Sequence, residues 1–158
     1  MEIIILPTEE AVAKRSADLV EAQIRTFPDT ILGLATGSSP LGLYNELVVR
    51  HQEHGLSFSQ VRTFNLDEYV GIHQDHAQSY RTFMNIHLFD KIDIEESNTH
   101  VPDGTMENPM QAGPAFEQKI KEAGGIDLQV LGIGTDGHIG FNEPTSSIRS
   151  RTRLKTLT

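Results

Sequence analysis

The 158-residue sequence contains no cysteine and no long run of apolar residues. Without cysteine the chain has no disulfide framework, thiolate nucleophile, iron–sulfur cluster or cysteine-based zinc site. The apolar start, residues 3–6, is short and lacks the basic flank of a signal peptide, and no run is long enough to span a bilayer. These absences predict a soluble, cytoplasmic domain without a membrane partner.

Positive charge is also scarce, with 13 basic against 22 acidic side chains and a formal net charge of −9. Nucleic acids and anionic membranes need a cationic footprint, so the balance argues against both as partners. The exception is the stretch 149–158, which carries four cations and no acid: Arg149, Arg151, Arg153 and Lys155. This stretch is predicted either to hold a small anion or to act as a charged strand edge that discourages aggregation.

The hydrophobic pattern alternates short β-type runs with longer helical ones. We expect strands over 3–6, 30–35, 61–65 and 127–132, with 148–157 as a further candidate, and helices over 8–26, 40–53, 79–89 and 110–123. Such alternation predicts an α/β fold, an open and mainly parallel sheet flanked by helices in three layers. Residues 1–158 are expected to form one domain. In such sheets ligands bind beyond the carboxyl ends of the strands.

The first strand-to-helix junction with polar content is Thr36-Gly37-Ser38-Ser39, followed by Pro40. Gly37 lets the backbone approach a ligand, and the hydroxyls would join free N–H groups at the positive end of a helix dipole. This combination predicts a phosphate cradle, although an ordinary helix start capped by Ser39 fits the same letters. It is not a Walker loop, because no Gly-Lys-Ser/Thr follows.

The second junction places two adjacent carboxylates, Asp67 and Glu68, directly after the strand over 61–65. Successive residues there point in different directions, so we expect at most one of them to face a pocket. A carboxylate in a dry strand terminus has a raised pKa and acts as a general base near neutral pH. The alternative is a solvated helix N-terminus, where acidic side chains favour the helix dipole.

The third junction contains Asp136, His138 and Glu143 among glycines, after the strand over 127–132. Either acid is suited to orient and charge-stabilise the imidazole, which gives an acid/base relay without a metal. The alternative is a hydrogen-bonded structural histidine.

Neither a cofactor nor a metal is predicted. The spelling Gly-x-Gly-x-x-Gly over 132–137 matches a dinucleotide fingerprint, but glycine and proline interrupt the helix it requires and no acid follows at the required distance. The histidine pairs His51/His54 and His73/His76 lie in polar stretches and do not match a zinc motif, so we interpret them as surface residues.

Taken together, the three junctions resemble those of the glucosamine-6-phosphate deaminase family. The resemblance rests on Thr36-Gly-Ser-Ser-Pro40 with Tyr44, Phe64-Asn-Leu-Asp-Glu-Tyr-Val-Gly71, Gly134-Thr-Asp-Gly-His-Ile-Gly-Phe-Asn-Glu-Pro144, and Ser150-Arg-Thr-Arg-Leu-Lys-Thr-Leu157. It covers essentially the whole chain. The related 6-phosphogluconolactonases share the fold and the Asp-Gly-His core, but not the Phe-Asn-Glu-Pro continuation or the Asn-x-Asp-Glu-Tyr segment.

The resemblance implies conversion of glucosamine 6-phosphate and water into fructose 6-phosphate and ammonium without a cofactor. By the family's pattern, Asp67 removes the C2 proton, and His138 assists ring opening with support from Asp136 and Glu143. The loop Thr36, Gly37, Ser38 and Ser39 holds part of the substrate phosphate.

The resemblance also implies features beyond the active site. In allosteric hexameric members, the segment matching Ser146, Arg153, Lys155 and Thr156 binds an N-acetylglucosamine 6-phosphate activator at subunit contacts, so a homo-oligomer is expected. Family members continue well past residue 158 and supply an arginine, a lysine and a mobile lid from that part. We therefore expect the α/β catalytic domain to be incomplete at its C-terminal end.

Two alternatives stay open from the sequence. The first keeps the fold and makes the protein a 6-phosphogluconolactonase-like hydrolase of phosphosugars. The second makes these 158 residues a sugar-phosphate-binding fragment without turnover.

Overall fold

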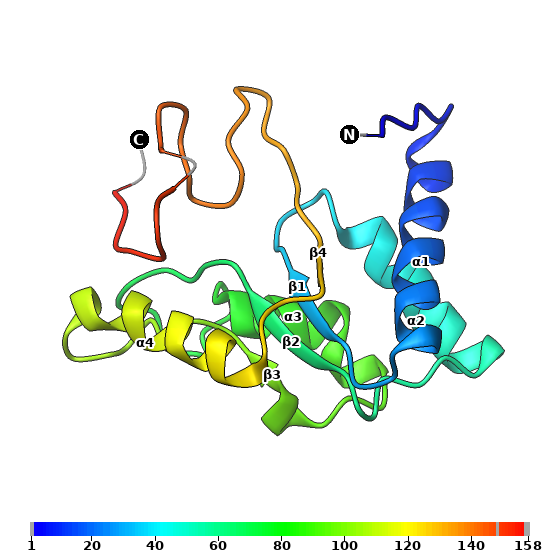
Figure 1. Ribbon diagram of the computed structural model, residues 1–158, viewed down its shortest axis with the longest axis horizontal. Helices are drawn as coiled ribbons and strands as arrows, with labels where there is room; N and C mark the ends of the chain where they lie inside the picture. Colours follow the sequence, from blue (N-terminus) through cyan, green and yellow to red (C-terminus); the bar gives the residue numbers. More distant parts are fainter. Residues whose placement is uncertain (1, 148, 157–158) are drawn as a thin grey trace.

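The computed structural model describes residues 2–147 and 149–156 (Figure 1). The helices are α1 (Glu9–Thr26), α2 (Leu41–His54), α3 (Tyr80–His87) and α4 (Pro109–Ala123), with short 3-10 turns at Phe89–Lys91 and Glu96–Asn98. The strands are β1 (Ile31–Leu34), β2 (Arg62–Asn65), β3 (Thr99–His100) and β4 (Leu128–Gln129). The predicted helices and three of the predicted strands, which are β1, β2 and β4, are confirmed to within a few residues.

All strand pairs in the sheet are parallel, and the strand order is β3-β2-β1-β4. In the central pair, Ile31 lies opposite Arg62 and Leu34 opposite Asn65. Because the chain reverses through a helix between neighbouring parallel strands, the carboxyl ends of β1, β2 and β4 meet at one edge. The predicted α/β class with a parallel sheet is confirmed, and the polar junctions lie at this edge.

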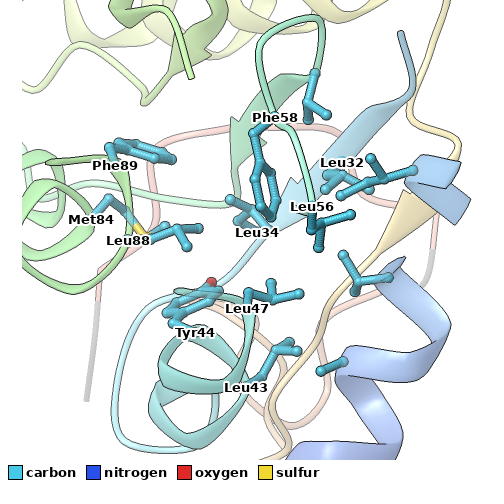
Figure 2. Close-up of a cluster of buried hydrophobic side chains, with 14 residues drawn as sticks. Leu32, Leu34, Leu43, Tyr44, Leu47, Leu56, Phe58, Met84, Leu88 and Phe89 are labelled. Carbon is cyan, nitrogen blue, oxygen red and sulfur yellow. The ribbon is translucent and has the colours of Figure 1, made fainter. Parts of the chain in front are cut away.

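Side-chain alternation along β1 separates two cores. Leu32 and Leu34 face the larger core, which α1, α2 and α3 cover with Tyr44, Leu47, Met84 and other apolar side chains (Figure 2). Ile31 and Phe64 face the opposite side, where Phe116 of α4 covers them. Successive residues of a strand point to opposite faces, so one short apolar strand serves both layers. This is the predicted three-layer arrangement.

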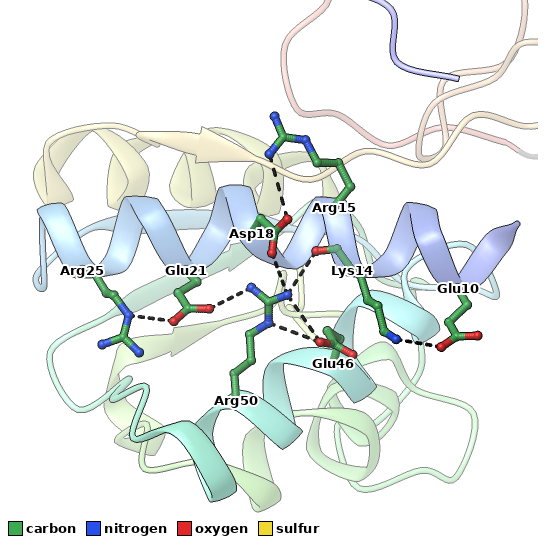
Figure 3. Close-up of polar contacts among 8 residues, drawn as sticks. All are labelled: Glu10, Lys14, Arg15, Asp18, Glu21, Arg25, Glu46 and Arg50. Carbon is green, nitrogen blue, oxygen red and sulfur yellow. Dashed lines mark hydrogen bonds and ion pairs between the residues drawn. The ribbon is translucent and has the colours of Figure 1, made fainter. Parts of the chain in front are cut away.

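Polar contacts join α1 to α2 on the outside of the larger core. The guanidinium of Arg50 in α2 is buried and donates to Asp18 at 2.8 Å and to Glu21 at 2.7 Å, both on α1 (Figure 3). It also contacts Glu46, one turn earlier on its own helix, at 3.3 Å. A buried guanidinium needs paired carboxylates, and here they come from both helices. The contact therefore sets how the two helices lie against each other.

Two predicted strands are wrong. Residues 3–6 form no strand, and Ile3 and Ile5 are 73% and 90% exposed. Both neighbours of β1 are taken by β2 and β4, and the chain start leads directly into α1 away from the sheet (Figure 1). Residues 149–156 also form no strand, while Ile148 and Leu157 lie outside the described residues. Their backbone binds side chains instead, as when the Thr152 N–H donates to Glu117 at 2.6 Å.

The sequence pattern missed β3, because a two-residue edge strand carries no periodicity. The strand predicted over 127–132 is shorter than expected, although hydrogen bonds from Asp127 to Ile31 and from Val130 to Gly33 continue its ladder. Among the described residues, no helix combines the length and the apolar character needed to cross a membrane.

Candidate active site

Asp67 lies in the turn that follows β2, and its side chain is mostly buried. Burial raises the pKa of Asp67 from its ordinary value to about 6, and the negative charge of Glu68 adds to this, while a backbone hydrogen bond from Phe141 opposes it. A carboxyl group with this pKa is largely ionised at neutral pH and still basic enough to accept a proton from carbon or oxygen. Of the two adjacent acids, Asp67 therefore has the properties of a general base.

Glu68 has a different environment. Its carboxylate accepts hydrogen bonds from the backbone N–H groups of Tyr80 at 2.8 Å and Arg81 at 3.2 Å, at the start of α3. It also accepts from the N–H of Tyr69 at 2.9 Å. The expectation that at most one of the two acids faces a pocket is wrong, because Asp67 and Glu68 both line the cavity described below, although only Glu68 also binds the backbone at the start of α3.

Three aromatic side chains pack beside Asp67, and the sequence reasoning missed them as site residues. The rings of Tyr69, Tyr80 and Phe141 have centroids 5.1 to 5.8 Å apart, and the two tyrosine hydroxyls lie 3.3 Å from each other. Burial, with the Tyr69 hydrogen bond and the charge of Asp67, raises the pKa of the Tyr80 hydroxyl above its usual range. Tyr69 and Phe141 stand within quoted motifs, which was the available signal, whereas Tyr80 stands outside all of them.

Asp136 and His138 form a pair within one turn. The Nδ1 atom of His138 lies 2.6 Å from an oxygen of Asp136, and the His138 backbone N–H donates to the same oxygen at 3.2 Å. These hydrogen bonds lower the pKa of Asp136. An ionised Asp136 accepts from Nδ1–H, which leaves Nε2 of the neutral imidazole as a proton acceptor. Both side chains are nearly half exposed, so the imidazole is accessible to a ligand.

Glycines shape the turn around His138. Gly137 has φ +89°, a conformation that disfavours other residues, and its N–H donates to the carbonyl of Gly134 at 3.0 Å. A Cβ placed on Gly134 would lie 2.3 Å from the imidazole Cε1. The ring of His138 therefore lies against bare backbone, a position that only glycine at 134 permits.

The second and third junctions meet at Gly140. A Cβ on this residue would lie 3.0 Å from Oδ2 of Asp67, and Gly140 is two residues from His138. Glu143 is half-buried and its carbonyl accepts from the Ser146 N–H at 3.0 Å. Within the described residues, no hydrogen bond or ion pair joins the Glu143 side chain to His138. The structure thus brings Asp136 and His138 together, and Asp67 lies against Gly140 of the same loop. Asp136, His138 and Glu143 are not among the residues that line the cavity beside Asp67.

The Thr36–Ser39 loop lies next to the third junction. Ser39 is exposed, and a Cβ on Gly132 would lie 3.3 Å from its hydroxyl oxygen. Ser39 is not the helix cap that was predicted: α2 begins at Leu41 and Pro40 occupies the N-cap position without a side-chain hydrogen bond. The reason is a turn in which the Ser38 carbonyl accepts the Leu41 N–H at 3.3 Å. Gly37 adopts φ +94°, which gives the loop its bend.

A cavity of about 390 Å³ opens beside Asp67. Its other walls include Tyr69, Phe141, Glu117 of α4, and the cations Arg151, Arg153 and Lys155. Ser146 is outside this lining but accepts a hydrogen bond from Arg153 at 3.4 Å. Thr156 is exposed. Cations of the stretch 149–158 therefore line the same cavity as Asp67. The sequence pattern did not indicate this, because residues 149–156 form no regular element.

Residues 2–147 and 149–156 contain no group of three or more histidine, aspartate or glutamate side chains arranged to hold a metal ion. The fold and the site define an α/β protein whose carboxylate and imidazole groups lie beyond the carboxyl ends of a parallel sheet. Such a site suits proton-transfer chemistry on a small polar ligand.

The chain belongs to the family of glucosamine-6-phosphate isomerases and 6-phosphogluconolactonases, whose sequence profile matches residues 7–143. A glucosamine-6-phosphate deaminase of Shewanella woodyi is 54% identical over 158 residues. One of Hahella chejuensis is 56% identical over the same length. Each of these alignments covers 100% of this chain and 60% of the relative. The chain thus spans about 60% of the length of the curated relatives it matches.

Two solved structures have folds similar to that of this chain. A monomeric glucosamine-6-phosphate deaminase superposes with a TM-score of 0.98 and 40% identity, over 100% of this chain and 66% of that one. A 6-phosphogluconolactonase of Thermotoga maritima superposes with a TM-score of 0.71 and 24% identity, over 89% of this chain and 63% of that one. The second likeness shows the shared fold alone.

Proposed function

We propose that the protein catalyses an aldose–ketose isomerisation with deamination, in which glucosamine 6-phosphate and water give fructose 6-phosphate and ammonium. The observation that carries this proposal is the half-buried carboxyl group of Asp67, with a pKa of about 6, on the wall of a cavity large enough for a phosphosugar. The identity to glucosamine-6-phosphate deaminases over the whole chain supports the choice of substrate. We further propose that residues 1–158 act as one α/β catalytic unit.

In this proposal the reaction begins with opening of the pyranose ring at His138. The neutral Nε2 atom accepts the proton of the C1 hydroxyl, and the protonated imidazole then supplies a proton to the ring oxygen as the C1–O5 bond breaks. Asp136 holds the ring through Nδ1 and stabilises the charge that forms on it. Glu143 is assigned to the same step from the family pattern alone, because no hydrogen bond or ion pair among the described residues joins its side chain to His138.

Asp67 then removes the proton from C2 of the open-chain aldose. The electron pair left by that C–H bond forms the C1–C2 double bond as the C1 carbonyl oxygen takes a proton from water. Asp67 then returns its proton to C1 while the nitrogen lone pair forms a double bond to C2, which gives an iminium group there. Water adds to the resulting C2 iminium, and ammonium leaves. A base with a pKa of about 6 is suited to both directions of this proton transfer at neutral pH.

The substrate phosphate is assigned to the Thr36, Gly37, Ser38 and Ser39 loop. Its exposed residues Gly37, Ser38 and Ser39 lie just before the N-terminus of α2, where backbone N–H groups and the helix dipole favour an anion. On a protein with a net charge of −9, such a local cradle is needed to hold an anionic substrate.

The direct test supplies glucosamine 6-phosphate and measures fructose 6-phosphate and ammonium. We expect kcat/KM to rise with pH through about 6, because the Asp67 carboxyl must lose its proton before it acts as a base. In heavy water, deuterium should enter the substrate C2 position in the wild-type protein and not in Asp67→Asn. Normal turnover in that variant would remove Asp67 from the mechanism.

Parallel assays separate the alternatives. Hydrolysis of 6-phosphogluconolactone without deamination would favour a lactonase, as the fold alone permits. Tight binding of glucosamine 6-phosphate without turnover would favour a sugar-phosphate-binding fragment. Either result contradicts the proposed reaction.

We also propose that Ser146, Arg153, Lys155 and Thr156 bind an N-acetylglucosamine 6-phosphate activator in a cytoplasmic homo-oligomer, a hexamer if the allosteric type applies. The contact between Arg153 and Ser146 and the cations near Asp67 support an anion at this place. The similar deaminase of known structure is monomeric, so sedimentation with and without the activator is the sharpest test. A monomer whose KM ignores the activator contradicts this part of the proposal.

A further inference from the structure

Asp67 lies between two residues that the backbone network holds in place. On its N-terminal side, the N–H of Leu66 donates to the carbonyl of Leu34 at 3.2 Å, which continues the pairing of β2 with β1. On its C-terminal side, Glu68 binds the start of α3. A residue flanked by two fixed neighbours has little freedom to change its own φ and ψ. The position of the Asp67 carboxylate therefore depends on both attachments.

The attachment through Glu68 completes the N-terminus of α3. The first four N–H groups of a helix have no partner within it. Here Glu68 accepts from Tyr80 and Arg81, the Ser79 hydroxyl accepts from Thr82 at 3.0 Å, and the N–H of Ser79 itself donates to the His76 carbonyl at 2.9 Å. Every one of the four is satisfied, two of them by Glu68. This side chain is therefore the link between the helix and the turn that carries Asp67.

The same link places the aromatic side chains beside Asp67. Tyr80 is the first residue of α3, so the hydrogen bond from its N–H to Glu68 holds the backbone from which the Tyr80 side chain extends. Its hydroxyl meets that of Tyr69, whose own N–H also donates to Glu68. One carboxylate thus holds the backbone of both tyrosines that pack near Asp67.

We propose that Glu68 is a positioning residue for the proton transfer at Asp67, which it holds in place by fastening the turn after β2 to the start of α3. The inference rests on the proposed function, since it assigns Asp67 as the base. It gives Glu68 a role different from that of Asp67, and residue type and spacing alone do not show which of the two acids has which role.

Glu68 also affects Asp67 through its charge, because its negative charge adds to burial in raising the pKa of Asp67. Other ionisable groups near the Asp67-Glu68 pair include the hydroxyls of Tyr69 and Tyr80 and the guanidinium of Arg81, which interacts with the charge of Glu68. Across the cavity lie Asp103, Glu117, Arg151, Arg153 and Lys155. Removing the negative charge at 68 should therefore lower the pKa of Asp67, with these groups unchanged.

The test compares Glu68→Gln with Ser79→Ala in the protein otherwise unchanged. Both variants weaken the start of α3, but Ser79 contacts only helix and loop backbone away from Asp67. In Glu68→Gln we expect kcat to fall about 10- to 100-fold with KM within about two-fold, since small misplacements of a catalytic group cost this much. The acid limb of the pH profile should move below 6. Ser79→Ala should keep the wild-type limb.

A third variant separates reach from charge. Glu68→Asp keeps the charge but is one methylene shorter, so we expect a loss of kcat similar to that of Glu68→Gln. It also carries the test if Glu68→Gln does not fold, as judged by circular dichroism. Wild-type kcat in Glu68→Asp or Glu68→Gln would overturn the inference. An equal loss with the same shift in Ser79→Ala would overturn it as well.

A readout that needs no turnover keeps this inference apart from the proposed function. Carbon-13 NMR of the side-chain carboxyl groups, with Asp67 assigned through Asp67→Asn, measures its pKa directly. A wild-type protein without deaminase activity would defeat the proposed function, whereas an unchanged Asp67 titration in Glu68→Gln would defeat the role of Glu68.

Discussion

The helix-covered side of the sheet and the loops beyond its carboxyl ends are held together in different ways. Under α1, α2 and α3, apolar side chains such as Leu47 and Phe58 are almost fully buried, and a buried Arg50 joins two helices. In the loops, Asp136 and His138 are nearly half exposed and are held by short-range hydrogen bonds and glycine turns. The first region therefore accounts for the stability of the fold, and the second holds ionisable side chains that a ligand can reach.

Asp67 lies at the boundary between the two regions. It follows a buried strand, yet it lines the cavity. An ionisable group kept partly out of water costs stability when it is charged, and the raised pKa of Asp67 measures that cost. The comparison therefore predicts that substitutions in the core lower the free energy of unfolding but leave kcat unchanged. Substitutions in the loops should lower kcat and leave the free energy of unfolding unchanged. Replacing Asp67 should lower kcat and raise the free energy of unfolding.

The largest effect is expected for Asp67→Asn. Loss of the base should lower kcat about 10²- to 10⁴-fold. Because the folded-state pKa of Asp67 is raised to about 6, the wild type loses stability as the pH rises from about 4 to 6, and the variant does not. At pH 8 the variant should be more stable by about 1–3 kcal/mol in urea unfolding, and the difference should vanish near pH 4.

Asp29→Asn is the matched control, because Asp29 is exposed and lies away from the cavity. It should change neither kcat nor the pH dependence of stability. An Asp67→Asn variant that is less stable than the wild type at pH 8 would contradict the boundary role given to Asp67.

Phe58→Ala tests the other side of the comparison. Phe58 is buried in the larger core, so its truncation should lower the free energy of unfolding by about 3–5 kcal/mol. The protein that remains folded should keep wild-type kcat. Phe27→Ala, at a position 55% exposed, should cost less than about 0.5 kcal/mol. A large fall in kcat for folded Phe58→Ala would show that the two regions are not independent.

Gly134→Ala changes the loop region without touching a charged group. The new methyl group would meet the imidazole of His138 at 2.3 Å, so the ring must move away from its place beside Asp136. We expect kcat to fall about 10- to 100-fold, with the free energy of unfolding changed by less than about 1 kcal/mol. In a His138→Gln background the same substitution should have no further effect on kcat. A further loss of kcat when Gly134→Ala is added to His138→Gln would show that the effect does not act through His138.

Arg50→Met should have the smallest effect. It leaves Asp18, Glu21 and Glu46 without their shared partner, but these carboxylates keep some contact with water, which limits the expected loss to about 1–2 kcal/mol. Salt at 1 M should reduce the loss by screening the repulsion among them. Arg15→Met, at an exposed ion pair, is the control and should be nearly neutral. A loss that grows with salt would contradict the electrostatic explanation.

The predictions from sequence succeeded where residues act through near neighbours. A helix was expected to begin at residue 8, and the Thr8 hydroxyl accepts from the Ala11 N–H at 3.1 Å as the N-cap of α1. Asp136 and His138 were grouped because they are two residues apart, and they do hydrogen-bond. In both cases the partner is within four residues, so the sequence contains the whole interaction.

The failures involve partners distant in the sequence. Residues 3–6 have the composition of a strand but pair with none, and the positions on both sides of β1 are occupied by β2 and β4. Residues 149–156 pack instead against α4, where Glu117 binds the Thr152 N–H and a Cβ on Gly113 would meet the Thr152 carbonyl. Composition cannot indicate which backbone groups find a partner far along the chain.

The sequence by itself determined the parallel α/β fold class, the polar junctions after its strands and the family to which they belong, because these depend on local periodicity and short motifs. The tertiary structure alone decided that Asp67 and Glu68 both line the cavity while only Glu68 binds the start of α3, and that Arg151, Arg153 and Lys155 share that cavity. The reason is that burial and electrostatic environment depend on segments up to 90 residues apart in sequence, which only packing brings together.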